Sequence, residues 1–427
     1  MKRIELAYGT GTIGVDIPSK NLVAVLELPP SHQKIELSEI EIIKKSLASP
    51  IDTAPLHILA HNKKKVVIIT SDHTRAVPSS ITMPLLLEEV RKGNPQADIT
   101  ILIATGLHRG MTNEEKVAKF GLDIFTNERL INHNAFDKNA FTDLGTLPSG
   151  SKCEINTLAI ECDLLISEGF IEPHFFAGFS GGRKSVLPGV ASQDCVNINH
   201  SASAIKHPLS VTGILDGNII HEDMIQAARL ANLSFILNVL LDENKKVIEA
   251  YCGDVDQAHR TGAESLMRRC GIDKVSADIV ITTNGGYPLD QNLYQCPKGL
   301  DAALSCVKEE GVIILAASCI DGLGGDNFGD LMLSAPSKEL LQRILSTPPE
   351  QTISEQWCAQ RFSDALLKYS IILVTDGLDR SQVERMNFIY TETIKDAVTK
   401  ALELKGKNAS IAVIPDGVGI IIRREEK

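Results

Sequence analysis

Apolar and polar positions follow one another in blocks that predict strands and helices in alternation. An apolar run at 64–70 (KKVVIIT) is typical of a buried strand, and a polar turn and a segment with helical spacing (ITMPLLLEEVRK) come after it. Further apolar runs stand at 98–105 (DITILIAT) and 162–170 (CDLLISEGF). A strand, a helix and a second strand in this order predict a parallel sheet, which binds ligands at the carboxyl ends of its strands.

Two local signals add detail to the first half of the chain. Thr112 and Glu115 stand in capping-box spacing, which predicts a helix that begins near Asn113. Residues 233–252 form two apolar runs around the turn D-E-N-K, which predicts a hairpin at the edge of the first sheet. An amphipathic helix is expected to follow, as far as about residue 269.

The alternation begins again in the second half. The runs ADIVITT, GVIILAAS, KYSIILVTDG and SIAVIPDG predict strands, with one helix near residue 300 and another at 391–406. A long polar stretch that extends through Trp357 lies between them. We therefore expect an α/β protein with mainly parallel sheets in two domains, the first at 1–270 and a smaller one at 275–427.

Composition narrows the class of protein. The chain has 427 residues, of which 43% are apolar and 23% charged, so a folded protein is expected. The net charge of −11 and the 4% of aromatic residues argue against nucleic acid and membrane surfaces as partners. No apolar run reaches the roughly 18 residues of a membrane-spanning helix. The nine cysteines include no C-x-x-C pair. Together with an N-terminus that lacks a signal peptide, this predicts a cytoplasmic location.

The loops that follow the first two strands carry groups suited to chemistry. Asp72, His73, Thr74 and Arg75 come directly after the first strand, and an arginine there can bind a carboxylate or phosphate through two parallel hydrogen bonds. The alternative is a solvated turn in which Asp72 only caps a helix. His108 follows the second strand and is a candidate acid or base, although a lone histidine at such a place is more often structural.

The segment EGFIEPHFFAGFSGGRKS, at 168–185, concentrates glycines, aromatic residues, His174 and Lys184. Its end is similar to a phosphate-binding P-loop, but that motif requires glycine where Arg183 stands, so we reject it. A lysine beside another cation and aromatic groups suits a nucleophilic amine. The alternative is a mobile anion-binding loop with Arg183 and Lys184 solvated.

Two further places are less specific. His200 lacks the partner of an H-x-x-x-H or H-E-x-x-H motif, so a metal there would need donors from outside the protein, and a structural role is the alternative. In the second half, Tyr294, Gln295 and Lys298 would share one face if the segment is helical. Pro297 weakens that helix, and an ordinary surface helix is the alternative.

Taken together, the motifs SDHTR-V-P, ATG-HR, EGFIE-HFFAGFSGGRKSVLPG, N-NH and TNGGYPLDQN-YQ--KG resemble those of the nickel-dependent lactate racemase family. The resemblance runs from about residue 64 to the C-terminal PDG-G-II, and the glycine-rich segment is its most specific part. It implies two α/β domains with the active site in the cleft between them. The implied cofactor is a nickel-pincer nucleotide, the nickel(II) complex of pyridinium-3,5-bisthiocarboxylic acid mononucleotide, made by accessory proteins.

The same resemblance implies roles for individual residues. Lys184 would carry the cofactor covalently, His200 would be the protein ligand of nickel, and the Asp72–Arg75 loop would contact the cofactor and position substrate. His108 and His174 would be the catalytic pair, which exchanges protons with the hydroxyl group while hydride leaves and returns to C2. The residues expected to face substrate are Arg75, Gln295, Lys298, Tyr294 and Trp357.

Two departures limit the choice of substrate. Pro173 before His174 and the pair Cys296-Pro297 before Lys298 are not expected in lactate-specific members, and both lie beside the implied substrate site. Tyr294 and Trp357 would crowd the pocket, which favours lactate. The alternatives are a racemase or epimerase of malate or a bulkier 2-hydroxy acid, an ATP-using enzyme built on the GGRKS loop, and an anion- or nickel-binding protein without catalysis.

Overall fold

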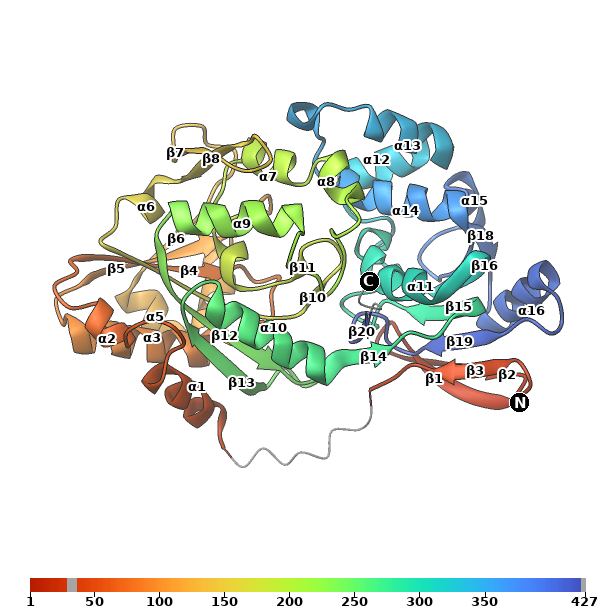
Figure 1. Cartoon of the computed structure of the whole chain (residues 1–427), viewed down its shortest axis with the longest axis horizontal. Helices are drawn as coiled ribbons and strands as arrows, with labels where there is room; N and C mark the ends of the chain where they lie inside the picture. Colours follow the sequence, from red (N-terminus) through yellow and green to blue (C-terminus); the bar gives the residue numbers. More distant parts are fainter. Residues whose placement is uncertain (29–36, 424–427) are drawn as a thin grey trace.

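The first of two six-stranded sheets is built mainly from the first half of the chain. In a computed structural model, which describes residues 1–28 and 37–423, its strand order is β13-β12-β9-β4-β5-β6 (Figure 1). The strands are β4 (Lys65–Ser71), β5 (Asp98–Ala104), β6 (Arg129–Asn132), β9 (Leu164–Phe170), β12 (Leu233–Leu241) and β13 (Val247–Gly253). All neighbours are parallel except β12 and β13, so the predicted edge hairpin is confirmed.

The second sheet has the order β18-β17-β16-β15-β19-β3, and all of its strands are parallel. Its strands are β3 (Leu22–Val25), β15 (Ala277–Thr283), β16 (Val307–Ala316), β17 (Ser370–Val374), β18 (Ile389–Thr391) and β19 (Ile411–Ile414). The α/β class with mainly parallel sheets is therefore confirmed. Four of these strands match the runs predicted from the sequence, and β3 and β18 were not predicted.

The N-terminal strands differ from the predicted division of the chain. Residues 1–270 were expected to form one domain, but β1 (Lys2–Tyr8) and β2 (Gly11–Ile17) pair with each other and pack on the second sheet, and β3 pairs with β19 inside it. Ile4 and Leu6 alternate with exposed residues, as in a strand with one buried face, and they join the apolar cluster of Ile279 and Val413. Because this apolar face is buried against the second sheet, the N-terminal strands belong with the second sheet rather than with the first.

Helices cover the sheets and connect their strands. Those of the first half are α1 (Glu39–Ala48), α2 (Leu56–Leu59), α3 (Ser79–Gly93), α4 (Asn113–Phe120), α5 (Leu122–Asn127), α6 (Thr157–Ile160), α7 (Gln193–Asn199), α8 (Ala202–Lys206), α9 (Ile219–Leu230) and α10 (Gln257–Cys270). Those of the second half are α11 (Pro297–Cys306), α12 (Asp326–Ser334), α13 (Ser337–Leu345), α14 (Gln356–Lys368), α15 (Arg380–Arg385) and α16 (Ile394–Lys405). The predicted capping box is confirmed, because Thr112 and Glu115 bond reciprocally at the start of α4. The long polar stretch through Trp357 contains α12, α13 and the first two residues of α14.

Short pairs of strands complete the fold. They are β7 (Phe141–Thr146) with β8 (Lys152–Asn156), β10 (Pro173–His174) with β11 (Gly178–Phe179), and β14 (Gly271–Asp273) with β20 (Ile421–Arg423). The largest apolar cluster is continuous between the halves: it contains Phe175 and Phe176 from the first and Leu293 and Trp357 from the second. Among the helices of the described residues, none is both long and apolar enough to cross a membrane.

Candidate active site

The carboxyl ends of β4 and β5 bring Asp72 and His108 together. His108 Nδ1 lies 2.8 Å from Asp72 Oδ2, and the other oxygen, Oδ1, accepts hydrogen bonds from the backbone N–H and the hydroxyl of Thr74, at 3.0 and 2.6 Å. Asp72 is 1% exposed, whereas the side chain of His108 is 48% exposed. Asp72 therefore does not cap the following helix, whose N-cap is Pro78, but holds His108 at the edge of the sheet.

The ionisation of Asp72 decides which nitrogen of His108 carries the proton. Burial alone would raise the pKa of this carboxyl, but the hydrogen bonds with His108 and Thr74 and the charge of Arg75 outweigh burial and lower it to about 2. An ionised carboxylate only accepts hydrogen bonds, so Nδ1 of His108 must donate. Nε2 is then the nitrogen left for a substrate.

The other two predicted residues of this loop have different surroundings. His73 turns towards Arg109 and Glu115, with Nε2 3.5 Å from Glu115 Oε1, and nothing in the structure joins it to Asp72 or His108. Arg75 is exposed, and its charge acts on His174 and Lys184. The structure thus brings Arg75 into the cluster and leaves His73 at its margin.

His174 stands in the β10–β11 hairpin among aromatic rings. Its ring is stacked on Phe175, with centroids 5.3 Å apart, and meets Phe176 edge to face at 4.5 Å. The backbone N–H of Ala177 donates to His174 Nδ1 at 3.3 Å. Burial, and then the charges of Lys184 and Lys298, hold the pKa of His174 well below its usual value. The ring is therefore neutral, with its proton on Nε2.

Lys184 lies in a tight turn of 3₁₀ helix at Gly182–Ser185, and its Nζ is 5.7 Å from the centre of the Phe176 ring. Burial, and then the charges of Arg183 and Arg75, hold the pKa of Lys184 well below its usual value, so a nucleophilic amine fits the surroundings. The alternative of a solvated loop is wrong for Arg183, which is 0% exposed. The guanidinium of Arg183 is also engaged by His221 and the Ala177 carbonyl, so it is not free to bind a phosphate.

His200 caps the end of α7 and is 4% exposed. Its ring meets Phe176 and Trp357 edge to face, at 4.8 and 5.0 Å, and its Nδ1 is buried without a hydrogen-bond partner. Burial, and then the charge of Lys184, lower the pKa of His200 to about 3, so the ring is neutral, as a metal ligand must be.

The surroundings of His200 can be tested against the implied cofactor. Among the described residues, no three histidine, cysteine, aspartate or glutamate side chains gather into a metal site. A metal at His200 would therefore take its other donors from a non-protein group. Phe176 contacts both the Lys184 amine and the His200 ring, so a group anchored at the lysine has the histidine beside it. The residues present fit a tethered metal cofactor.

The second half adds residues from the connection between β15 and α11. The segment is not one helix, as the sequence analysis had considered: Tyr294 and Gln295 lie in a turn of 3₁₀ helix, and α11 begins afresh with Pro297 as its first residue. Lys298 then lies in the first turn of α11, and burial is the largest cause of its lowered pKa. The side chains of Tyr294 and Trp357 are hydrogen-bonded, which connects this turn to the start of α14.

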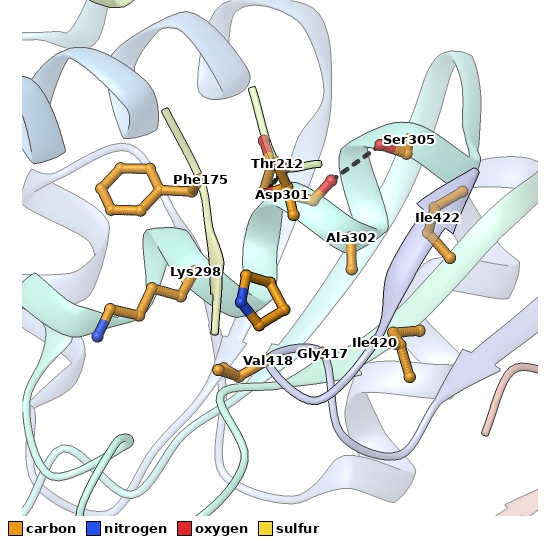
Figure 2. A pocket seen from close by; sticks show the side chains of 11 residues that line it. Phe175, Thr212, Lys298, Asp301, Ala302, Ser305, Gly417, Val418, Ile420 and Ile422 are labelled. Carbon is orange, nitrogen blue, oxygen red and sulfur yellow. Dashed lines mark hydrogen bonds between the residues drawn. The ribbon is translucent and has the colours of Figure 1, made fainter. Parts of the chain in front are cut away.

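Behind Lys298 is a small pocket between the halves (Figure 2). Pro173 and Phe175 line it from the first half, and the Thr212 hydroxyl donates to Asp301 of α11 at 2.7 Å. In Figure 2 the ammonium of Lys298 extends away from the apolar end of this pocket. The departure at Pro173 therefore lines the same pocket as Lys298.

Three residues of the site were not predicted from the sequence. Glu172 is the acid whose charge acts on both Lys184 and Lys298. Glu355 has a left-handed backbone (φ 75°), accepts the Phe328 N–H at 3.1 Å, and its carboxyl feels the charge of His108. Arg361 of α14 donates to the Phe175 carbonyl at 3.2 Å. Glu172 lies inside the glycine-rich segment, and no local pattern marks the other two.

Comparison with known proteins covers the whole chain. A model described as the lactate racemase N-terminal domain matches residues 8–213, and one described as the lactate racemase C-terminal domain matches 272–422. The chain is 46% identical over 426 residues to a lactate racemase of Thermoanaerobacterium thermosaccharolyticum, covering 100% of both chains. It is 45% identical over 424 residues to a lactate racemase of Lactiplantibacillus plantarum, covering 99% of this chain and 100% of the relative.

Solved structures agree with these matches. The lactate racemase apoprotein from Thermoanaerobacterium thermosaccharolyticum superimposes with a TM-score of 0.95 at 46% identity, over 99% of this chain and 100% of the other. A protein from Thermotoga maritima superimposes with a TM-score of 0.65 at 20% identity, over 91% of this chain and 99% of the other. The second match shows only that the fold is shared.

Proposed function

The chain belongs to the lactate racemase family and is a racemase, and from this premise we propose that it interconverts L- and D-lactate with a nickel-pincer nucleotide attached to Lys184. The nine cysteines, all within the described residues, are free, which supports our proposal of a cytoplasmic location. Accessory proteins that make the cofactor belong to the same proposal.

One observation carries the proposed substrate class. Arg75, Lys184 and Lys298 all act electrostatically on His174. Glu172 is the acid that acts on the two lysines. With the Lys184 amine assigned to the cofactor, Arg75 and Lys298 are the cations that attract an anion, and an arginine fork binds a planar carboxylate through two parallel hydrogen bonds. A 2-hydroxy acid supplies that carboxylate.

We infer that the carboxylate of the substrate binds to Arg75 and Lys298. Because Lys298 comes from α11 and Arg75 from the loop after β4, this contact would use both halves of the chain. Gln295 precedes Lys298 on the same connection and is proposed to bind the substrate as well. Tyr294 and Trp357, joined by their side chains, are proposed to limit the size of the substituent at C2.

The two histidines are proposed to move the hydroxyl proton. With Asp72 ionised, His108 offers Nε2 as a base, whereas His174, with Nδ1 occupied by the Ala177 N–H, offers its Nε2 proton. Racemisation returns hydride to the face of C2 opposite to the one it left, which turns the substrate oxygen towards a different group, so a base and an acid in separate surroundings suit it. The proposed order is loss of the hydroxyl proton to one histidine and return of a proton to the oxygen from the other, after which exchange with water restores both rings.

The cofactor would be held by three groups of this chain. Lys184 would anchor it through its amine, His200 would ligate the metal, and the loop from Asp72 through His73 and Thr74 to Arg75 would contact the nucleotide. When bound, the cofactor supplies an acceptor and donor of hydride for C2 of the substrate. Burial of the Lys184 and His200 side chains among Phe176 and Trp357 excludes water from the group that would lie between them.

The proposal is tested on protein made in a host that synthesises the cofactor. We expect an added mass that maps to Lys184, about one nickel per chain, and conversion of either lactate enantiomer into the other. If the adduct forms but lactate is not converted, the same mechanism would apply to malate or a bulkier 2-hydroxy acid. The absence of adduct and nickel in a competent host contradicts the proposal. ATP hydrolysis that survives nickel removal and Lys184→Ala would favour a nucleotide-using enzyme.

A further inference from the structure

Arg183 is the largest side chain that is fully buried, at 0% exposure, and it directly precedes Lys184. Its guanidinium makes no ion pair with a carboxylate among the residues that the structure describes. A buried charge without an acidic partner is costly, and proteins keep one only where its hydrogen bonds are well satisfied. The free-energy cost of burying this charge, at the residue directly before the proposed anchor, indicates that Arg183 has a specific role.

Two histidines from different helices hold the guanidinium. Arg183 Nε donates to His221 Nδ1 of α9 at 3.0 Å, and Nη1 lies 2.8 Å from His259 Nε2 of α10. His259 Nε2 is also 2.8 Å from the Ser180 carbonyl, so one tautomer accepts from Arg183 and the other donates to Ser180. Burial and the charge of Arg183 lower the pKa of His221 to about 3 and keep that of His259 well below its usual value. The cluster therefore carries one positive charge.

The remaining donors of the guanidinium reach backbone carbonyls of the glycine-rich segment. Nη2 donates to Ala177 at 2.7 Å, and Nη1 lies 3.4 Å from the Ser180 oxygen and 3.3 Å from the Gly181 oxygen. A lysine has no planar fork and cannot reach this set of acceptors at once. The site thus selects arginine by shape rather than by charge alone.

These contacts tie Arg183 to both functional residues on either side of it. Ala177, whose carbonyl accepts from Arg183, donates its own N–H to His174 Nδ1 at 3.3 Å. The Gly181 carbonyl that accepts from Arg183 also accepts the backbone N–H of Lys184 at 3.1 Å. The guanidinium is therefore connected to the proposed acid through one residue and to the proposed anchor through one carbonyl.

We propose that Arg183, held by His221 and His259, is a positioning residue that fixes His174 and Lys184 relative to each other. The roles of those two residues rest on the proposed function, but the cluster itself does not. Gly182 supports the arrangement, because its φ of +52° favours glycine and a Cβ there would come within 2.9 Å of the His259 ring. In the segment 181–184 (GGRK), the structure thus explains the choice of glycine at 182, arginine at 183 and lysine at 184.

The first test uses the protein without cofactor. Arg183→Lys keeps the charge and removes the fork, so we expect faster amide hydrogen exchange confined to residues 174–189. The matched control is Arg260→Lys, in which a partly exposed guanidinium on α10 pairs with Asp216 and Asp256 outside the cluster. We expect no change in exchange at 174–189 in the control.

The second test uses protein loaded with cofactor. In Arg183→Lys we expect kcat, counted per chain that carries the adduct, to fall about 100-fold, the cost of a small misplacement. We expect KM to change less than about threefold, since the residue does not contact substrate. A variant that only weakened the fold would lower the melting temperature without this separation of kcat from KM.

A pair of variants at His221 keeps the proposal testable if Arg183→Lys does not fold. His221→Asn retains an acceptor at the Nδ1 position and should stay close to wild type in exchange and in kcat, whereas His221→Leu should resemble Arg183→Lys. Equal behaviour of the two variants, or unchanged exchange and kcat in Arg183→Lys, would overturn the positioning role. If the wild type carries no adduct and racemises nothing, the proposed function fails, and the exchange measurements still decide the role of the cluster.

Discussion

His108 and His174, the proposed catalytic pair, stand in opposite surroundings. The ring of His108 is half exposed and held by an ionised carboxylate, with Asp72 Oδ2 2.8 Å from its Nδ1. His174 lies among the rings of Phe175 and Phe176, near Lys184, Lys298 and Arg75, and its Nδ1 accepts a backbone N–H. One ring donates through Nδ1 and the other accepts there.

The difference shows how one residue type can serve as base and acid at the same pH. The tautomer of a histidine follows from the partner of its other nitrogen. Asp72 occupies Nδ1 of His108 as an acceptor and leaves Nε2 for a substrate, whereas the Ala177 N–H occupies Nδ1 of His174 and leaves a proton on its Nε2. The two rings would thus present Nε2 to a substrate with opposite partners on Nδ1.

The largest effect is expected when either ring is removed. His108→Gln and His174→Gln should each lower the rate of racemisation by about 1,000-fold, since general acid or base catalysis contributes up to about 10⁴-fold. The measurement is lactate interconversion per chain that carries the Lys184 adduct, whose mass should persist in both variants. If one variant retains most of its activity, that residue is not a member of the pair.

A smaller effect should separate the two rings. Asp72→Asn leaves His174 untouched but removes the ionised acceptor of His108 Nδ1, and an amide can turn its NH₂ towards the ring and favour the wrong tautomer. We expect kcat to fall about 100-fold, between the loss of a hydrogen bond and the loss of the base. Equal kcat in Asp72→Asn and wild type would contradict the tautomer argument for His108. The matched control is Thr74→Val, which removes one hydroxyl bond to Asp72 and should cost far less.

A further variant tests the aromatic wall beside His200. Trp357→Phe keeps a ring against His200 and removes the N–H that bonds Tyr294, so the pocket loosens while the proposed metal ligand stays. We expect about a tenfold loss of preference for lactate over a bulkier 2-hydroxy acid, the scale of one lost pocket contact. Comparison of kcat/KM for the two acids is the measurement, and a uniform loss for both would assign Trp357 to cofactor binding.

The smallest expected effect concerns His133, a buried histidine outside the site. His133 is 2% exposed, its Nε2 lies 3.0 Å from the Ala191 carbonyl and its Nδ1 lies 3.1 Å from the Asn156 amide nitrogen, so the neutral ring satisfies both partners. Burial lowers the pKa of His133 to about 4. The unfolded chain therefore binds a proton in the window between about pH 6.5 and 4 that the folded chain does not, and stability is lost as pH falls through this window.

We expect His133 to account for about 1 to 2 kcal/mol of the stability lost between pH 7 and pH 5. The measurement is denaturant unfolding of cofactor-free wild type and His133→Gln at both pH values. The variant should be less stable at pH 7 and should lose less on acidification. If the two proteins lose the same free energy, the neutral state of His133 makes no contribution.

Much of the fold follows from local patterns, and the exceptions share a cause. The runs that became β4, β5, β9 and β12 are apolar at successive positions, as strands buried on both faces are. The N-terminal strands are only half buried, and the apolar run of β3 is only four residues long. Its place is set by β19, nearly 400 residues away. Nothing local in Leu22–Val25 indicates that partner.

The residues of the site likewise divide into those that local sequence predicts and those that it does not. Asp72, His108 and Lys184 follow directly from loops at strand ends and from an unusual glycine-rich segment, and their surroundings in the structure suit chemistry. Glu355 and Arg361 could not be predicted, since their contacts reach to the chain's first half or to another helix. Arg183 was set aside as the residue that breaks a P-loop, and its buried contacts with α9 and α10 became visible only in three dimensions.

The pairing of β3 with β19 has a consequence for how the chain is made. The ribosome makes β3 long before β19, yet the two strands lie side by side in the second sheet. The first sheet, whose strands span residues 65–253, can form while the N-terminal strands still wait without a neighbour. The second sheet is therefore complete only when β3 pairs with β19. A fragment that starts after the first sheet lacks β3 and would leave the edge of β19 open to pairing with other chains.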